Sequence, residues 1–210
     1  MSTGRLEAFS DGVIAVAITL LVLNIGVPSF AETRHYGLAT ALGRNWPVYA
    51  AFVTSFLTIG IIWINHHVMI QRLREPDHMI LFLNLLLLMS IAVLPFATSL
   101  MATYLKQSQG QHLAAGIYSG AFLVMAVFFA TLNRHIMLVK PHRLREELPL
   151  ERRRQILRRT VSGVIPYAVA TVLAVVSPYA TLAICLALAV FYAFPIASGG
   201  NAAESTETTE

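Results

Sequence analysis

Four side chains able to carry protons or form strong hydrogen bonds lie in stretches that are otherwise apolar. Ser10 and Asp11 stand in the first turns of an apolar run, 5–27, and His66 and His67 stand near the end of another. A carboxylate inside a membrane helix costs roughly 2.5–3.5 kcal/mol on insertion scales, so Asp11 marks a site with a role. Together with the histidines it could relay protons, and a histidine beside Ser10 could activate a nucleophile.

These polar groups also fall at a similar depth in their runs. At a rise of 1.5 Å per residue, Asp11 lies roughly 7–8 Å from the inner end of the first run. The others at this depth are Asn65, His66, His67, Asn84, Asn133 and His135. Because buried amides and carboxylates need partners, the favoured interpretation is an interhelical network in which Ser10 and Asp11 lock the first helix to the second and third. A proton relay is the alternative, and we expect Trp63 to serve packing.

The composition is that of an integral membrane protein. The 210 residues are 56% hydrophobic and 12% charged, whereas a soluble domain has roughly 25% charged residues. The net charge of +4 does not indicate a nucleic-acid partner, because the basic residues lie between apolar runs and are not interleaved with aromatic ones. The single cysteine, Cys185, lies in an apolar run and cannot form an intrachain disulfide.

The apolar runs predict an all-α fold of six transmembrane helices. A helix needs about 20 apolar residues to cross a core of about 30 Å. The runs predict spans near 6–27, 47–70, 79–105, 113–139, 160–177 and 179–197. The last two come from one long region divided at Ser177-Pro178, because proline disfavours helix at the residue before it. We expect a six-helix transmembrane domain over 1–197 and a disordered polar tail over 198–210.

The basic residues predict the orientation. With the N-terminus inside, 12 of the 15 lysines and arginines fall in inner segments, and Arg34, Arg44 and Lys106 remain outside. Both termini should therefore be cytoplasmic, an N-in, C-in topology. The segment 140–159 is the one long basic stretch, and we interpret it as an inner loop that fixes orientation. Binding of membrane lipids through anionic headgroups is the second interpretation.

The first run has two distinct faces. At 100° per residue, one apolar stripe lies within about 60° of Val16. Its members are Val16, Thr19, Leu20, Leu23 and Val27. Ser10 and Asp11 lie at about +120° and −140° from Val16, so the acid cannot face what the stripe faces. An apolar stripe on a membrane helix faces lipid or core by default.

The start of the chain resembles a known family. Arg5, Phe9, Ser10 and Asp11 form R-x-x-x-F-S-D, followed by Gly12-Val13 and then by ITLLVL at 18–23. This is similar to the first-helix signature of the transmembrane protein 175 family of potassium channels, in its prokaryotic single-repeat form. The match covers about two dozen residues, and the remainder agrees in the number and polarity of its spans.

The resemblance implies a function and an assembly. In that family four copies meet on an axis, the first helix lines the pore, and apolar side chains form the constriction. If this chain follows the family, the stripe would line the pore of a homotetramer that conducts potassium ions, with protons as a second candidate ion. The chain has no T-V-G-Y-G filter, so a hydrophobic gate on the first helix would replace it. We expect no enzyme activity, cofactor or fixed metal, and a prokaryotic plasma (inner) membrane location.

Two other functions remain open from the sequence. One is a proton-coupled secondary transporter that uses Asp11, His66 and His67. The other is a membrane-embedded hydrolase in which Ser10 is activated by one of the histidines. In the channel interpretation the signature motif and anchoring network comprise Arg5, Phe9, Ser10, Asp11, Asn65, His66, His67 and Asn84.

Overall fold

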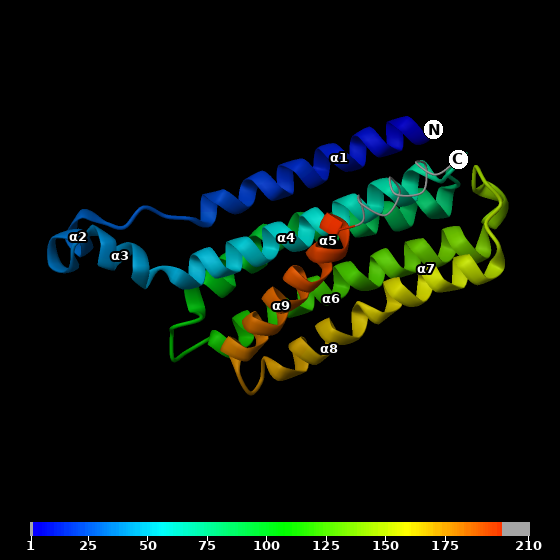
Figure 1. Ribbon diagram of the computed structural model, residues 1–210. Coiled ribbons are helices and arrows are strands. Elements are labelled where there is room, and N and C mark those ends of the chain that lie inside the picture. Colours follow the sequence, from blue (N-terminus) through cyan, green and yellow to red (C-terminus); the bar gives the residue numbers. More distant parts are fainter. Residues whose placement is uncertain (1, 199–210) are drawn as a thin grey trace, which may run out of the picture.

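The computed structural model describes residues 2–198, which form a bundle of long helices packed side by side (Figure 1). Five helical segments in this range are long and apolar enough to cross a membrane. They are Thr3–Asn24, Trp46–Gln71, His78–Tyr104, Gln111–Val139 and Leu150–Leu173. A shorter apolar helix, Pro178–Ala193, follows them. The predicted all-α membrane architecture is therefore confirmed, and each of the first four predicted spans overlaps a helix of the structure.

The core lies between α4 (Trp46–Gln71), α5 (His78–Tyr104) and α6 (Gln111–Arg134). Tyr118 and Phe122 of α6 are fully buried and meet edge to face, with their ring centroids 4.8 Å apart. The Tyr118 hydroxyl lies 3.2 Å from Ser55 Oγ, which is 2.8 Å from Thr98 Oγ1. Hydroxyl contacts thus join α4, α5 and α6 inside an otherwise apolar interior, where unpaired polar groups would be costly.

Helix α1 (Thr3–Leu20) lies at one edge of the bundle against α4 and α5 (Figure 1). A 3₁₀ turn, Leu21–Asn24, extends it. The predicted span 6–27 is therefore wrong at its outer end, and Val27 lies beyond the helix. Pro28 accounts for this, because it disfavours helix at Val27. The Asn24 amide donates to the Pro95 carbonyl at 3.2 Å and ties the end of the turn to α5.

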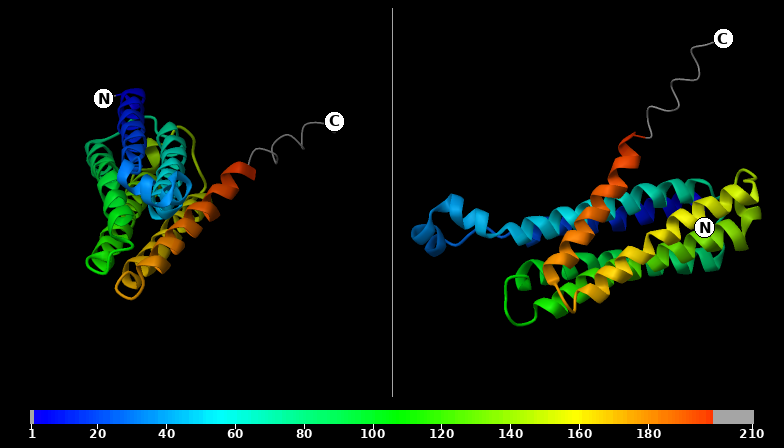
Figure 2. Two further views of the ribbon diagram at one scale, coloured as in Figure 1. Left: turned by 90° about the vertical axis from the view of Figure 1, so that its left-hand side faces the viewer. Right: turned by 60° about the horizontal axis from the view of Figure 1, so that its bottom comes forward.

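Two short helices that the sequence analysis did not anticipate connect α1 to α4. Helix α2 (Phe30–Tyr36) and helix α3 (Leu38–Arg44) project from one end of the bundle (Figures 1 and 2). Gly37 separates them with a φ of 75°, a left-handed conformation that glycine adopts without a Cβ clash.

The interpretation of 140–159 as a loop is wrong for its second half. Helix α7 (Leu150–Ser162) begins ten residues before the predicted fifth span, and α8 (Val164–Leu173) continues it after Gly163. Arginine, glutamine and leucine favour helix, and the aliphatic stems of arginines can lie along apolar surface with their charges in water. A basic segment can therefore form the first part of a candidate span, here Leu150–Leu173.

The turn predicted at Ser177-Pro178 is present. Helix α8 ends at Leu173, and α9 (Pro178–Ser198) begins at the proline, which suits the first position of a helix. Helix α9 crosses the bundle at an angle (Figure 2). Of the tail predicted at 198–210, residues 199–210 lie outside the described part of the chain.

Asp77 caps the N-terminal end of α5, outside the span. Its Oδ1 accepts the Ile80 N–H at 2.8 Å, and its Oδ2 lies 3.8 Å from His135 Nε2. Burial alone would raise the pKa of Asp77, but the Ile80 hydrogen bond and the nearby charges of His135 and Lys140 lower it below its ordinary value. This carboxylate therefore stabilises the fold above its unfolded pKa, and that contribution is lost as pH falls through the lowered folded pKa.

Replacing Asp77 with alanine should cost about 0.5–2 kcal/mol, because the cap is lost. Asp77→Asn retains a capping oxygen and should lose less at neutral pH. Its thermal unfolding midpoint in detergent should also depend less on pH below about 5, since no carboxylate remains to protonate. Equal losses for the alanine and asparagine variants would contradict the capping role.

Candidate ion pathway

Helix α1 packs on the bundle through one face only. That face consists of Thr3, Leu6, Ser10, Ile14, Ala17 and Leu21, all of which are buried. At 100° per residue these positions fall within about 40° of the direction of Ser10. Sequence periodicity and burial therefore agree on which side of α1 faces the protein.

The predicted stripe lies on an exposed side of α1. Val16 is 58%, Leu20 43% and Leu23 74% exposed, and Thr19 is exposed with its hydroxyl donating to the Val16 carbonyl at 2.9 Å. The 3₁₀ turn keeps Leu20 and Leu23 in line, since residues three apart eclipse in that conformation. Val27 is also exposed, but the angular argument for it fails because it lies beyond the helix.

An apolar groove of about 470 Å³ runs along this side of α1. Phe9, Gly12, Val16 and Leu20 line it from α1, and Ala92 lines it from α5. The groove is open, and α1 stands at the edge of the bundle (Figure 1). The exposed side of α1 in one chain therefore encloses no passage, and any pathway along it needs further chains.

Behind the stripe, a buried hydrogen-bond chain joins three helices. His66 Nε2 on α4 lies 2.7 Å from Asn84 Oδ1 on α5, and the Asn84 amide donates to Ser10 Oγ on α1 at 3.0 Å. The Ser10 hydroxyl in turn donates to the Leu6 carbonyl at 2.9 Å. Because Asn84 Oδ1 is an acceptor, His66 must carry a proton on Nε2. This chain fixes α1 against α4 and α5.

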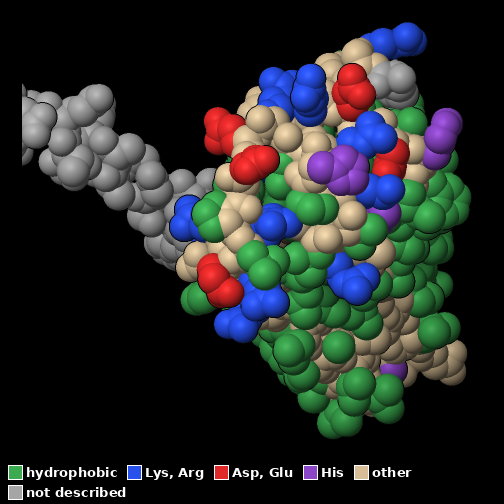
Figure 3. All heavy atoms as spheres, turned by 90° about the vertical axis from the view of Figure 1, so that its right-hand side faces the viewer, with side chains coloured by type: hydrophobic (Ala, Val, Ile, Leu, Met, Phe, Trp, Pro, Cys, Tyr) green, Lys and Arg blue, Asp and Glu red, His purple; other side chains and the backbone are tan. Residues whose placement is uncertain are grey.

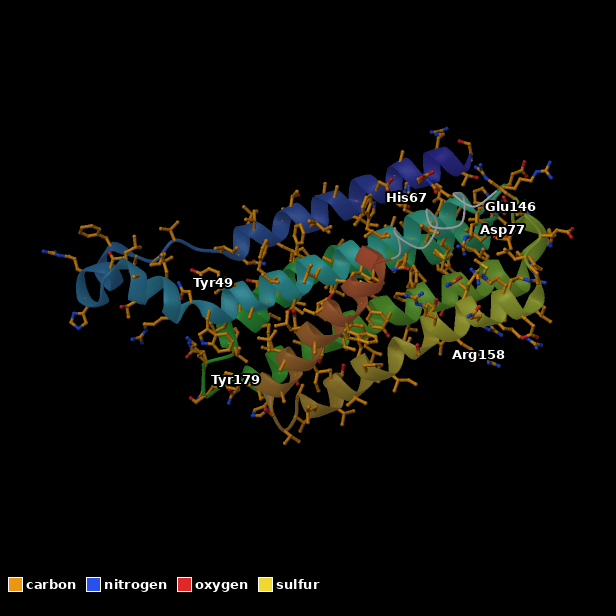
Figure 4. The ribbon with its side chains drawn as sticks, in the orientation of Figure 1. Tyr49, His67, Asp77, Glu146, Arg158 and Tyr179 are labelled. Carbon is orange, nitrogen blue, oxygen red and sulfur yellow. The ribbon has the colours of Figure 1, made fainter. Side chains whose placement is uncertain are left out.

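Asp11 belongs to a second, more exposed cluster. The Trp63 indole donates to Asp11 Oδ1 at 2.8 Å, and His67 Nδ1 lies 3.8 Å from Asp11 Oδ2 and 3.1 Å from Glu7 Oε1. His67 lies beside the first turns of α1 (Figure 4). Sequence reasoning missed Glu7 and assigned Trp63 to packing. The signal was spacing, since Glu7 precedes Asp11 by four residues and Trp63 precedes His67 by four, which places each pair on one helix face.

The predicted single polar layer is therefore several separate groups. The Asn65 amide donates to the Ile61 carbonyl of its own helix at 2.7 Å and is not part of the α1 anchor. Successive residues of a helix point in different directions, so Asn65 does not share the faces of α4 that carry His66 and His67. The Asn133 amide donates to Thr160, and His135 lies near Asp77. Of the signature residues, Arg5 and Phe9 are exposed, and Ser10 and Asp11 make the contacts with other helices.

The arrangement bears on the chemistry each cluster can perform. Ser10 is bonded to an amide and a carbonyl, so its geometry does not provide the histidine base that a hydrolase needs. Asp11 and His67 approach each other, whereas His66 is held by Asn84, so the three do not form one relay. Glu7, Asp11 and His67 place potential ligand atoms within 4.8 Å of one another. Among the described residues, they form the one group with the spacing that a metal ion requires.

Comparison with known proteins identifies a family. A family model described as "Endosomal/lysosomal potassium channel TMEM175" matches residues 5–95. A protein from Streptomyces collinus named as a potassium channel is 43% identical over 196 residues, which cover 91% of this chain and 92% of that one. The crystal structure of a lysosomal potassium-selective channel TMEM175 homolog from Chamaesiphon minutus matches with a TM-score of 0.81, at 38% identity, over 91% of this chain and 96% of that chain.

A more distant relative carries a different name. The chicken (Gallus gallus) endosomal/lysosomal proton channel TMEM175 is 37% identical over 117 residues. The match covers 53% of this chain and 23% of the chicken protein.

Proposed function

This chain belongs to the TMEM175 family, and we propose that it is a potassium-permeable channel of a prokaryotic plasma membrane. The family resemblance at residues 5–23 is confirmed by relatives that match most of the chain. Those relatives are named as ion channels, which supports transport rather than enzymatic chemistry. The observation that carries the proposal is the exposed apolar side of α1, backed by a buried polar anchor.

A pore along α1 requires several chains around an axis, and we propose a homotetramer. One helix face cannot enclose a passage, whereas four copies of α1 can surround one. Val16, Leu20 and Leu23 would then each form an apolar ring, and Thr19 would form a ring of hydroxyls close to them. Native mass measurement across protein concentrations tests this assembly, and a species that stays monomeric would contradict it.

The gate in this proposal is a hydrophobic constriction. Apolar rings exclude water when the passage is narrow, and ions cannot cross a dewetted segment. The Thr19 hydroxyls could replace part of the water shell of a passing ion, which would favour potassium modestly over sodium. The anchor of Ser10, Asn84 and His66 would set the position of α1 and hence the width of the neck.

We also propose that the chain crosses the membrane six times with both termini inside, α9 being the sixth span. Charged side chains gather at one end of the bundle (Figure 3). That end holds Arg72, Arg143 and Arg145 in the connections α4–α5 and α6–α7, and α1 begins there (Figure 1). The accumulation agrees with the 12 of 15 basic residues assigned inside. Reporter fusions at the two termini test this, and opposite locations would remove one span.

Proton permeation is a second candidate property. It is motivated by the chicken relative, which is named as a proton channel. The partly exposed cluster of Glu7, Asp11 and His67 supplies titratable groups near the inner end of α1.

Reversal potentials in planar bilayers test the proposed function. Purified protein between potassium chloride and sodium chloride solutions should give a current whose reversal potential is shifted toward the potassium equilibrium potential. A transporter instead predicts flux that saturates and depends on a substrate. A reversal at the chloride potential when the two chloride concentrations differ, or saturable flux without conductance, would contradict the channel.

A further inference from the structure

A second groove, distinct from the α1 face, lies among α4, α6, α7–α8 and α9. Its volume is about 470 Å³, within the roughly 300–1,000 Å³ typical of small-ligand pockets. On α4 its lining runs from Thr58 to Arg72, and on α7–α8 from Arg152 to Tyr167. No residue of α1 lines it, so its occupant would not lie in the proposed ion pathway.

The inner end of this groove is basic. Arg72 from the end of α4 and Arg152 and Arg159 from α7 line it, and no aspartate or glutamate does. Within residues 2–198, carboxylates pair with Arg143 and Arg154, but no ion pair involves these three arginines. Gln155 of α7 and Asn65, which lies halfway along the α4 lining, add amide groups. Two helices thus contribute cationic hydrogen-bond donors to the groove, and guanidinium groups suit a phosphate.

The rest of the groove is lined mainly by apolar side chains, with Thr58, Asn133 and Thr160 among them, and has the length of one membrane leaflet. Ile61, Ile62 and Phe129 line it between α4 and α6, and Ala189 lines it from α9. From Arg72 to Thr58, the α-helical rise of 1.5 Å per residue gives about 21 Å. Half of the hydrocarbon core is about 15 Å, so the groove extends from the headgroup level to near the bilayer centre.

We infer that this groove binds one anionic phospholipid of the inner leaflet. Its phosphate would lie among Arg72, Arg152 and Arg159, and an acyl chain would lie over Ile61, Ile62 and Phe129. A second copy of this chain is a poorer occupant, because it would have to present acidic groups to all three arginines at this depth. The inner-leaflet assignment rests on the proposed topology, but binding itself can be measured without conductance.

Native mass spectrometry of the full-length protein in detergent tests the lipid site. Phosphatidylglycerol should bind, phosphatidylcholine should bind more weakly, and inorganic phosphate should not displace the bound lipid. Each arginine near a membrane surface contributes about fivefold in affinity, so the triple variant Arg72→Gln, Arg152→Gln, Arg159→Gln should lose about 100-fold. The corresponding triple lysine variant should keep most of the binding.

The matched control removes the same charge elsewhere on the inner side. The triple variant Arg134→Gln, Arg154→Gln, Arg158→Gln changes three exposed arginines that do not line the groove. Arg158 lies on the face of α7 that points away from the other helices (Figure 4). This control variant should bind phosphatidylglycerol with the same affinity as the unmodified protein. The single variant Arg159→Gln changes an exposed position of α7 and should lower the affinity for phosphatidylglycerol about fivefold. It provides the same test if the triple variant does not fold.

Three results would overturn the inference. Equal losses in the groove variant and the control would show general charge attraction only. Displacement by inorganic phosphate would show an anion site without a lipid chain. A groove variant that changes oligomeric state while lipid binding is retained would show that the groove is an interface between copies. None of these results bears on whether α1 lines a potassium pathway.

Discussion

Replacing Leu23 with serine should raise the resting potassium conductance by at least about tenfold, which corresponds to roughly 1.4 kcal/mol of barrier. Leu23 is 74% exposed on the stripe and lies in line with Leu20 through the 3₁₀ turn. A ring of four leucines would keep the neck dry, and a ring of serines is both wider and able to bond water. Single-channel recording of purified protein measures the effect.

The matched control is the exposed neighbour of Leu23. Val22 is 52% exposed, but the 3₁₀ turn rotates it by about 120° from Leu23, toward the side of α1 away from Leu20. Val22→Ser should leave conductance near the parent value. Leu20→Ser should act like Leu23→Ser if both rings contribute to the constriction. Similar conductance in all three variants would show that the apolar stripe is not the gate.

The second large effect is expected on stability. Asn84→Leu removes both links of the buried chain and leaves His66 Nε2 and Ser10 Oγ without Asn84. Each buried group left unsatisfied costs about 1–3 kcal/mol, and interhelical bonds in membranes are at the weaker end, so the expected loss is about 2–4 kcal/mol. Thermal unfolding in detergent and the yield of assembled protein measure it.

Asn65→Leu is the control for this substitution. Its amide bonds only to Ile61 within α4, so the change should fall within about 0.5 kcal/mol of the parent. A double variant, Ser10→Ala with Asn84→Leu, should cost less than the sum of the two single variants, because they remove the same contact. Additive losses would show that Ser10 and Asn84 are not coupled.

The sequence predicts the first four spans to within a few residues because hydropathy reports a physical requirement of the membrane. It also separates the two faces of α1, since period and burial follow the same helix geometry. It does not predict which of several polar residues at one depth become partners. Asn84 and Asn65 are equivalent by depth, yet only Asn84 reaches Ser10. That choice depends on helix rotation and packing, which no local pattern encodes.

The predicted boundaries of the first and fifth spans are wrong for local reasons, which an average of hydropathy over many residues does not show. Val27 lies in an apolar run, but Pro28 ends the helix before it. Helix α7 is rich in arginine, so its charge suggests a loop although its residues favour helix. The basic groove is not visible in the sequence, because residues 72 and 152–159 come to line one groove only after α4 has packed on α5 and α9, and α7 on α6.

Cysteine scanning along α1 is the most direct test of a potassium pathway lined by this helix. The buried Cys185 is first replaced by alanine, so that each introduced cysteine is the only one. A charged, membrane-impermeant thiol reagent should then block potassium current at Val16→Cys, Leu20→Cys and Leu23→Cys. It should have little effect at Ala15→Cys and Val22→Cys, which are exposed on another side of α1. Block at the second set and none at the first would contradict the account.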